Sequence, residues 1–145
     1  IATDQHQLIQ DYDVAAGVAD VDRSVPLADR LLGRYGANRV ASLSFDKGCT
    51  REAGRELLSL YVPTVVMPKR GKKNAAETER ESAKPFVALR HQHSAVESAI
   101  NSLEHHGLNR CLDVGLAGYL RYVGYGVMSY NLHQIGRQLL ARASG

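Results

Sequence analysis

Strand-like and helix-like segments alternate along the first half of this chain, and this alternation limits the fold more than any other feature. The sequence predicts strands at 7–17, 38–46 and 62–68, and helices at 22–36 and 50–61. Strands that are joined through helices usually lie parallel in one sheet. We therefore expect an α/β domain whose sheet is at least partly parallel.

The predicted helices carry recognisable end signals. Ser24 is expected to cap the first helix, Pro26 suits its first turn, and Gly36 suits its end. Thr50 is the expected cap of the second helix. The positions predicted to form the apolar face of the first helix are Val25, Ala28, Leu31, Leu32 and Tyr35.

The second half of the chain has a different character. Residues 69–84 hold six Lys or Arg and three Glu. The net charge of this segment is therefore +3, which equals the net charge of the whole chain. The pattern of residues 85–105 predicts one long amphipathic helix, which ends at Gly107. Residues 116–143 are predicted to be mostly helical and apolar. The predicted apolar positions of the long helix are Phe86, Leu89, His93, Val96, Ile100 and Leu103.

Composition excludes several classes of protein. The 145 residues are 44% hydrophobic, enough for one domain with a core, and no apolar run reaches the roughly 18 residues of a membrane span. Two distant cysteines, Cys49 and Cys111, favour neither a disulfide scaffold nor a Cys-based zinc site. We expect a reducing, cytoplasmic setting without a signal peptide. A pI of about 9.0 is compatible with nucleic-acid binding.

Asp46 ends the strand-like stretch "SLSFDKGC" and has two interpretations. Asp, Lys and Gly are common in turns, so Asp46 can simply form one. Alternatively, ligands of α/β sheets bind at the carboxyl ends of strands, where an Asp can hold a divalent metal.

Glu97 also has two interpretations. It belongs to a polar row on the long helix, formed by Arg90, Ser94, Glu97, Asn101 and Glu104. Such a row is usually solvated, but one that borders the apolar face can face a cleft. The six histidines place no two imidazoles one helical turn apart, so we expect His93 at the edge of the core rather than in a zinc site.

Four stretches taken together resemble the catalytic core of bacterial insertion-sequence transposases of the DDE type. They are "LSFDKG", "VVMPKRGKK", "RHQHSAVESAINSLEHHGLNRC" and "RYVGYGVMSYNLHQIG", in family order over nearly the whole chain. The resemblance implies a ribonuclease H-like (RNase H-like) fold, here a partial mixed sheet with flanking helices and a helical C-terminal part. It also implies one catalytic domain over 1–145, with a strand and helix half at 1–68, a basic loop at 69–84 and a helical part at 85–145.

The resemblance further implies the chemistry of the chain. It makes Asp46 and Glu97 catalytic ligands of Mg²⁺ or Mn²⁺, with two ions in the complete enzyme. It also makes double-stranded DNA at transposon ends the partner and the bacterial cytoplasm the location. Gly107, Leu108 and Arg110 match a family Gly-Leu-x-Arg motif, and Asn131 and Leu132 match its Asn-Leu. The expected DNA-binding residues are Lys47, Lys69, Arg70, Lys72, Lys73, Arg90, His93, Asn101 and Arg110.

The family uses three acids, and the first of them has no counterpart here. Its strand is expected to precede Ile1, so we expect a fragment of a catalytic domain. Two alternatives remain open. One is a DNA-binding remnant without catalysis, and the other is a protein–protein interaction module, for instance a homodimer formed through the helical part.

Overall fold

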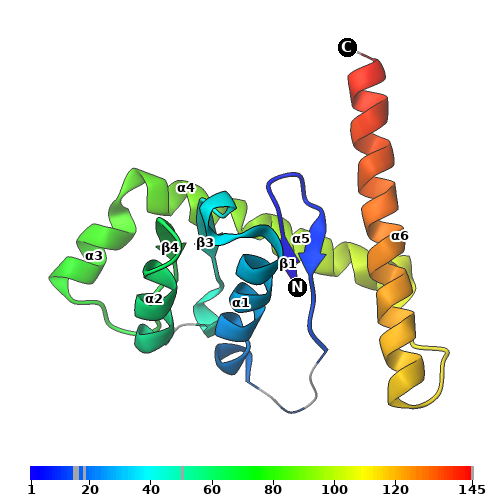
Figure 1. Cartoon of the computed structure of the whole chain (residues 1–145), viewed down its shortest axis with the longest axis horizontal. Coiled ribbons are helices and arrows are strands. Elements are labelled where there is room, and N and C mark those ends of the chain that lie inside the picture. The colour runs from blue at the N-terminus through cyan, green and yellow to red at the C-terminus, as the bar shows by residue number, and fades with distance from the viewer. Residues whose placement is uncertain (15–16, 18, 50, 145) are drawn as a thin grey trace. The chain divides into compact units, whose positions relative to one another are not determined.

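The structure is a computed structural model that describes residues 1–14, 17, 19–49 and 51–144 (Figure 1). The chain is of mixed α/β type, mostly helical, with small two-stranded sheets. Its strands are β1 (Ala2–Thr3), β2 (Ile9–Asp11), β3 (Ser42–Ser44) and β4 (Thr64–Val66). Its α-helices are α1 (Ser24–Tyr35), α2 (Glu52–Ser59), α3 (Ala75–Ser82), α4 (Lys84–Gln92), α5 (Ser94–Leu103) and α6 (Gly115–Ala143).

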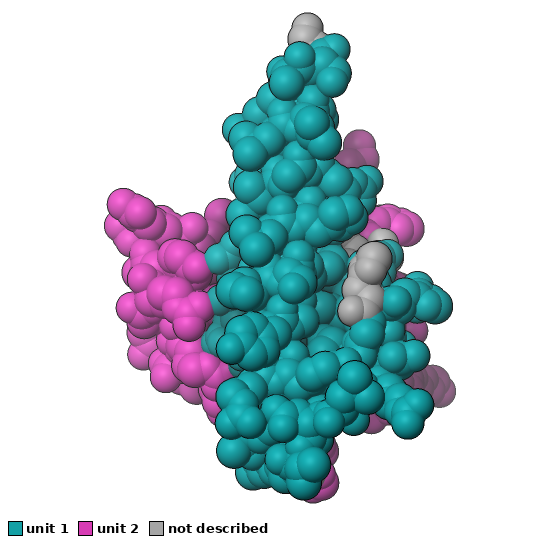
Figure 2. All heavy atoms as spheres, turned by 90° about the vertical axis from the view of Figure 1, so that its right-hand side faces the viewer, with its two compact units in different colours: residues 1–14, 95–145 teal, residues 15–94 magenta. Residues whose placement is uncertain are grey.

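The chain forms two compact units, which Figure 2 distinguishes by colour. One unit consists of residues 15–94, and the other of residues 1–14 together with 95–145. None of the helices in the described part combines the length and apolar content needed to cross a membrane.

The 15–94 unit is built on the parallel pair β3 and β4. Ser42 pairs with Thr64, and Ser44 with Val66. Helices α1 and α2 pack together with β4, and their buried side chains form one cluster. The cluster contains Ala28, Leu58 and Met67, with Val25, Leu43, Phe45 and Val65 against it. The predicted α/β character is therefore confirmed, and so is parallel pairing of the strands predicted at 38–46 and 62–68, although each is only three residues long. The strand predicted at 7–17 is not part of this sheet, because β2 pairs antiparallel with β1 in the other unit.

The predicted cap of the first helix is wrong. Ser24 is already the first residue of α1, and its hydroxyl donates to the Val21 carbonyl at 3.2 Å. A short 3-10 turn, Asp20–Asp22, leads into the helix, and Arg23 in the cap position has helical backbone angles. An N-cap residue normally leaves the helical region, so no site for side-chain capping arises here. Thr50 lies outside the described residues, and Arg51 holds the cap position of α2.

The segment 69–84 is not a loop throughout, as predicted, because it contains the helix α3. Helix α3 begins with a complete capping box, in which the Asn74 side chain accepts from the Glu77 N–H and the Glu77 side chain accepts from the Asn74 N–H, both at 2.8 Å. Only the part before Asn74 is a loop.

The predicted long helix is interrupted. Helix α4 ends at Gln92 and α5 begins at Ser94, with His93 between them. After α5 the chain makes a π-helical turn, Glu104–Leu108, in which Gly107 has a φ of +111°. Glycine adopts this left-handed region without strain, so the predicted stop at Gly107 is confirmed.

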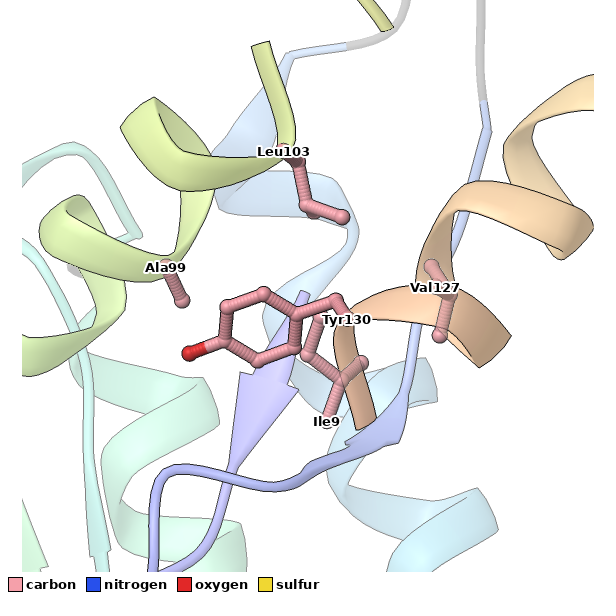
Figure 3. Close-up of a cluster of buried hydrophobic side chains, with 5 residues drawn as sticks. All are labelled: Ile9, Ala99, Leu103, Val127 and Tyr130. Atoms are coloured by element: carbon pink, nitrogen blue, oxygen red, sulfur yellow. The ribbon is translucent and has the colours of Figure 1, made fainter. Parts of the chain in front are cut away.

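In the other unit, an N-terminal hairpin packs with α5 and α6. Strands β1 and β2 are antiparallel, and the Asp4 carboxylate closes the turn between them by accepting from the N–H groups of His6 at 2.8 Å and Leu8 at 2.9 Å. The buried cluster of this unit contains Ile9, Ala99, Leu103, Val127 and Tyr130 (Figure 3). The helical C-terminal part is confirmed as the single helix α6.

Two glycines let other groups approach α6 closely. A Cβ on Gly126 would lie 2.7 Å from the Leu108 side chain, and one on Gly118 would lie 2.7 Å from the Asp113 carboxylate. Contacts this short do not occur for a real Cβ, so Gly126 provides the space that the Gly107–Leu108 turn occupies.

Candidate nucleic-acid interface

An acid and a basic segment leave the same edge of the β3–β4 sheet. The last paired residues of the two parallel strands are Ser44 and Val66, and the Phe45 N–H donates to the Val66 carbonyl at 2.8 Å. Asp46 follows β3 by two residues, and the segment 69–73 begins three residues after β4. Both therefore start from the carboxyl edge of a parallel sheet, where ligands of α/β folds bind.

Asp46 forms the turn that one of its two interpretations requires. Its Oδ2 accepts from the Gly48 N–H at 3.3 Å, and its carbonyl accepts from the Cys49 N–H at 3.1 Å. The side chain is exposed, and Oδ1 has no hydrogen-bond partner among the described residues. The turn is confirmed, while metal binding through the outward-facing carboxylate stays a prediction. Lys47, the next residue, is also exposed.

The basic segment is held at both ends by carboxylates of α3. The Lys69 ammonium pairs with Glu77 at 2.6 Å, and the Lys69 N–H donates to Glu81 Oε1 at 2.8 Å. The Lys73 ammonium pairs with Glu81. Arg70 and Lys72, between these anchors, are exposed and have no charged partner in the described part of the chain. The segment therefore presents two cations to solvent, while Lys69 and Lys73 fix its conformation.

Glu81 is the central anchor, since its side chain is only 3% exposed. Burial tends to raise the pKa of this carboxyl. The Lys69 N–H and the Lys73 ammonium outweigh that effect, so the pKa lies below its usual value. Glu77 likewise has a lowered pKa, because Lys69 and the Asn74 N–H bind its carboxylate. Charged Glu81 thus stabilises the folded segment.

Protonation of Glu81 is expected to release the basic segment. A carboxyl whose pKa is lowered by folding contributes stability above its unfolded pKa, and this contribution is lost as the pH falls through the folded pKa. We therefore expect the basic segment to loosen below about pH 4.5. The Glu81→Gln substitution should lower the free energy of unfolding by about 1–3 kcal/mol at neutral pH and make stability depend less on pH. Thermal unfolding of the wild type and the variant between pH 3 and pH 7 measures these two effects. An equal pH dependence in the variant would contradict the role of Glu81.

The other predicted residues of this unit lie on α4 or just after it. Arg90 is exposed. His93 is half-buried, and its Nδ1 has no hydrogen-bond partner in the described part. The prediction that His93 lies at the edge of the core is confirmed.

Glu97 and Asn101 lie on α5, in the unit formed by 1–14 and 95–145. Both are exposed, as is Glu104 in the π-helical turn, so this part of the polar row is solvated. The side chain of Ser94 lies outside the described residues. A hollow of about 450 Å³ in this unit is lined by Leu103, Leu108 and side chains of α6 from Tyr122 to His133. The polar row does not line it.

The Gly-Leu-x-Arg turn has a structural role that sequence reasoning missed. The Tyr122 hydroxyl donates to the carbonyl of Gly107 and lies 3.0 Å from that of Arg110, so α6 binds the turn at two points. The Arg110 side chain itself is exposed and remains a candidate for DNA contact. The only sequence signal was the recurrence of tyrosines along α6.

Asn131 holds the hairpin against α6. Its Oδ1 accepts from the Ile9 N–H at 2.8 Å, and its Nδ2 donates to the Ile9 carbonyl at 2.9 Å. An amide side chain matches both groups of a peptide unit in this way. Its neighbour Leu132 is 61% exposed. In this fold Asn131 therefore serves packing between the helix and the hairpin.

The described residues contain no group of three or more His, Cys, Asp or Glu side chains that could hold a metal ion. Asp46 belongs to one unit and Glu97 to the other. Mg²⁺ is nevertheless often bound by only one or two carboxylates, with waters and substrate phosphates as its other ligands. The exposed carboxylate of Asp46 fits that mode of binding.

In comparisons with known proteins, this chain matches no family model, no curated protein and no solved structure. The residue chemistry and the geometry described above are therefore the basis for any assignment of function.

Proposed function

We propose that this chain is a catalytic-domain fragment of a bacterial DDE-type insertion-sequence transposase with an RNase H-like fold. In this proposal it binds double-stranded transposon ends in the cytoplasm and takes part in the metal-dependent strand cleavage and transfer of DNA transposition. Support comes from the four sequence stretches and from the geometry of the carboxyl edge of the β3–β4 sheet.

The observation that carries the proposal is the common origin of Asp46 and the basic segment at one sheet edge. Phosphodiester chemistry needs an acid that can hold a divalent cation and cations that hold the phosphate backbone. Here the exposed Asp46 carboxylate follows β3, and the exposed Arg70 and Lys72 follow β4. Because α3 fixes the segment before any ligand arrives, binding would cost little ordering of the loop.

In the proposed enzyme, Asp46 and Glu97 would each supply carboxylate oxygens to Mg²⁺ or Mn²⁺, with two ions in the complete enzyme. Two such ions would supply activation of the attacking oxygen and stabilisation of the leaving one. Asp46 keeps one carboxylate oxygen on its own turn, which holds the side chain at the sheet edge, and its other oxygen has no hydrogen bond in the described structure.

Removing Arg70 and Lys72 is expected to weaken DNA binding. Each phosphate contact that is lost should lower the slope of log affinity against log salt by about 1, so Arg70→Ala/Lys72→Ala should lower it by about 2, without sequence preference. Fluorescence anisotropy with a labelled duplex over a range of salt concentrations measures this effect.

Arg39→Ala provides the matched control. Arg39 is exposed but precedes β3, so it lies toward the opposite edge of the same sheet. The control should leave the salt slope within the error of the wild type. If Arg39→Ala lowers the salt slope as much per removed charge as Arg70→Ala/Lys72→Ala does, DNA is attracted by charge without a defined site. That result would remove the support for an interface at this sheet edge.

A DNA-binding remnant without catalysis is the second candidate. It is favoured by one observation, that no three potential metal ligands form a group among the described residues. Such a remnant would retain the salt-dependent DNA binding and would show no Mn²⁺ bound at Asp46 in the DNA complex.

A further inference from the structure

Helix α6 is apolar on two separate faces. Val127 and Tyr130 on one face are buried against Ile9 and α5. Another face carries large apolar side chains that remain 42–64% exposed, namely Tyr125, Met128, Leu132, Ile135 and Leu139. A surface helix needs only one apolar face to pack on its own domain. The second face therefore has a different use.

The exposed side chains follow the repeat of a coiled coil. Their spacings along α6 are three, four, three and four residues, which is the alternation of the a and d positions of a heptad. We name this row from Tyr125 to Leu139 the α6 seam. It is about 21 Å long at 1.5 Å per residue, and the last turns of α6 extend beyond the rest of their own unit (Figure 1).

The positions beside the seam suit an identical partner. The residues that flank it as e and g positions are Gly124, Ser129, Asn131, Gly136 and Gln138. None of them is charged, so two copies would meet without like-charge repulsion along the seam. An acidic or basic partner, in contrast, would find no complementary charge there.

The available area is that of a weak interface. The five seam side chains expose on the order of 500 Å² per copy, or roughly 1,000 Å² for two copies, which is at the low end for specific interfaces and fits a dimer that forms only with rising concentration. The helix is already held in place by its buried face and by the bond from Asn131 to Ile9. Pairing would therefore not have to pay for helix formation.

We propose that the α6 seam binds the α6 seam of a second copy of this chain, as a short two-stranded coiled coil. The buried face of α6 stays within its own unit, and the seam forms the contact between copies. This pairing is independent of DNA binding, and its failure would leave the test of Arg70 and Lys72 unaffected.

Two neighbouring leucines allow a sharp test. Leu139 belongs to the seam, whereas Leu140 is 70% exposed on another face of the same turn. Sedimentation velocity of the 145-residue chain from about 1 to about 200 μM should show a dimer that forms with concentration. Leu139→Glu and Leu132→Glu should each raise the dimer dissociation constant at least about 30-fold, and Leu140→Glu should change it less than about threefold.

Three results would overturn the proposal. They are a wild-type chain that stays monomeric at the highest concentration, equal weakening by Leu139→Glu and Leu140→Glu, and a dimer that neither seam variant affects. Circular dichroism of each variant establishes that the helix is intact. If the seam variants stay monomeric like the wild type but lose affinity for duplex DNA, the seam binds nucleic acid instead, and the pairing of copies is wrong.

Discussion

Asp46→Asn is expected to reduce DNA cleavage and strand transfer by at least about 10³-fold in a transposase that contains this chain. The amide keeps the size and the turn of the aspartate but removes the negative charge that would hold a divalent cation in the proposed enzyme. Duplex affinity should change less than about threefold, because the cations of the basic segment remain. Glu97→Gln should have the same effect, and a strand-cleavage assay with a labelled transposon end measures both.

Asp29→Asn is the matched control for this prediction. Asp29 is an exposed aspartate on α1, within the same unit as Asp46. It should retain full activity. If Asp46→Asn or Glu97→Gln retained cleavage as Asp29→Asn does, that residue would not be a metal ligand, and for Asp46 only the turn would remain.

Asn131→Leu is expected to destabilise the unit formed by 1–14 and 95–145 by about 2–4 kcal/mol. Leucine has a similar size and a higher helix propensity, so the loss comes from the two peptide groups of Ile9 that it leaves without partners. Ile9 is only 5% exposed, so water does not easily replace the amide. Urea unfolding, followed by circular dichroism, measures the change.

Gln134→Leu makes the same kind of replacement one turn later. Gln134 is half-buried on α6 and has no hydrogen bond in the described structure. Its replacement should be neutral or slightly stabilising. If Asn131→Leu lowers the free energy of unfolding no more than Gln134→Leu does, the two hydrogen bonds from Asn131 to Ile9 contribute nothing to stability.

The sequence was sufficient to predict features set by local patterns. Alternating apolar segments with Gly or Pro boundaries predicted the parallel β3–β4 pair and its flanking helices, and Gly107 predicted the end of the helical segment. These features depend on periodicity and on backbone freedom, which individual residues determine. Asp46 was correctly placed after a strand for the same reason.

Features set by contacts between distant residues were not predictable. The spacing of apolar residues predicts Ile100 in the apolar face of the helix, but Ile100 is 42% exposed and Ala99, at 1%, is the buried residue. A difference of one residue turns a helix face by about 100°, and the small side chain of Ala99 leaves room for the ring of Tyr130 (Figure 3).

The candidate site shows the same division. Composition revealed the basic segment, but not that α3 carboxylates neutralise Lys69 and Lys73 and leave Arg70 and Lys72 exposed. The exposure of Arg70 and Lys72 depends on helix α3, which starts with the capping box at Asn74. The one clear sequence signal for this start is the Asn-x-x-Glu pattern. Asn131 was noted only as part of a motif, because its partner Ile9 is 122 residues away.

The most direct test of the proposed function is a Mn²⁺ titration of the isotope-labelled chain bound to a short duplex, followed by paramagnetic broadening of backbone amide signals. Mn²⁺ replaces Mg²⁺ at oxygen ligands and broadens the signals of nearby nuclei. We predict selective broadening of Lys47 and Gly48 beside Asp46, weaker without DNA because phosphates complete the ligand set, and absent in Asp46→Asn. Broadening that is uniform along the chain, or unchanged in Asp46→Asn, would contradict a metal site at this sheet edge.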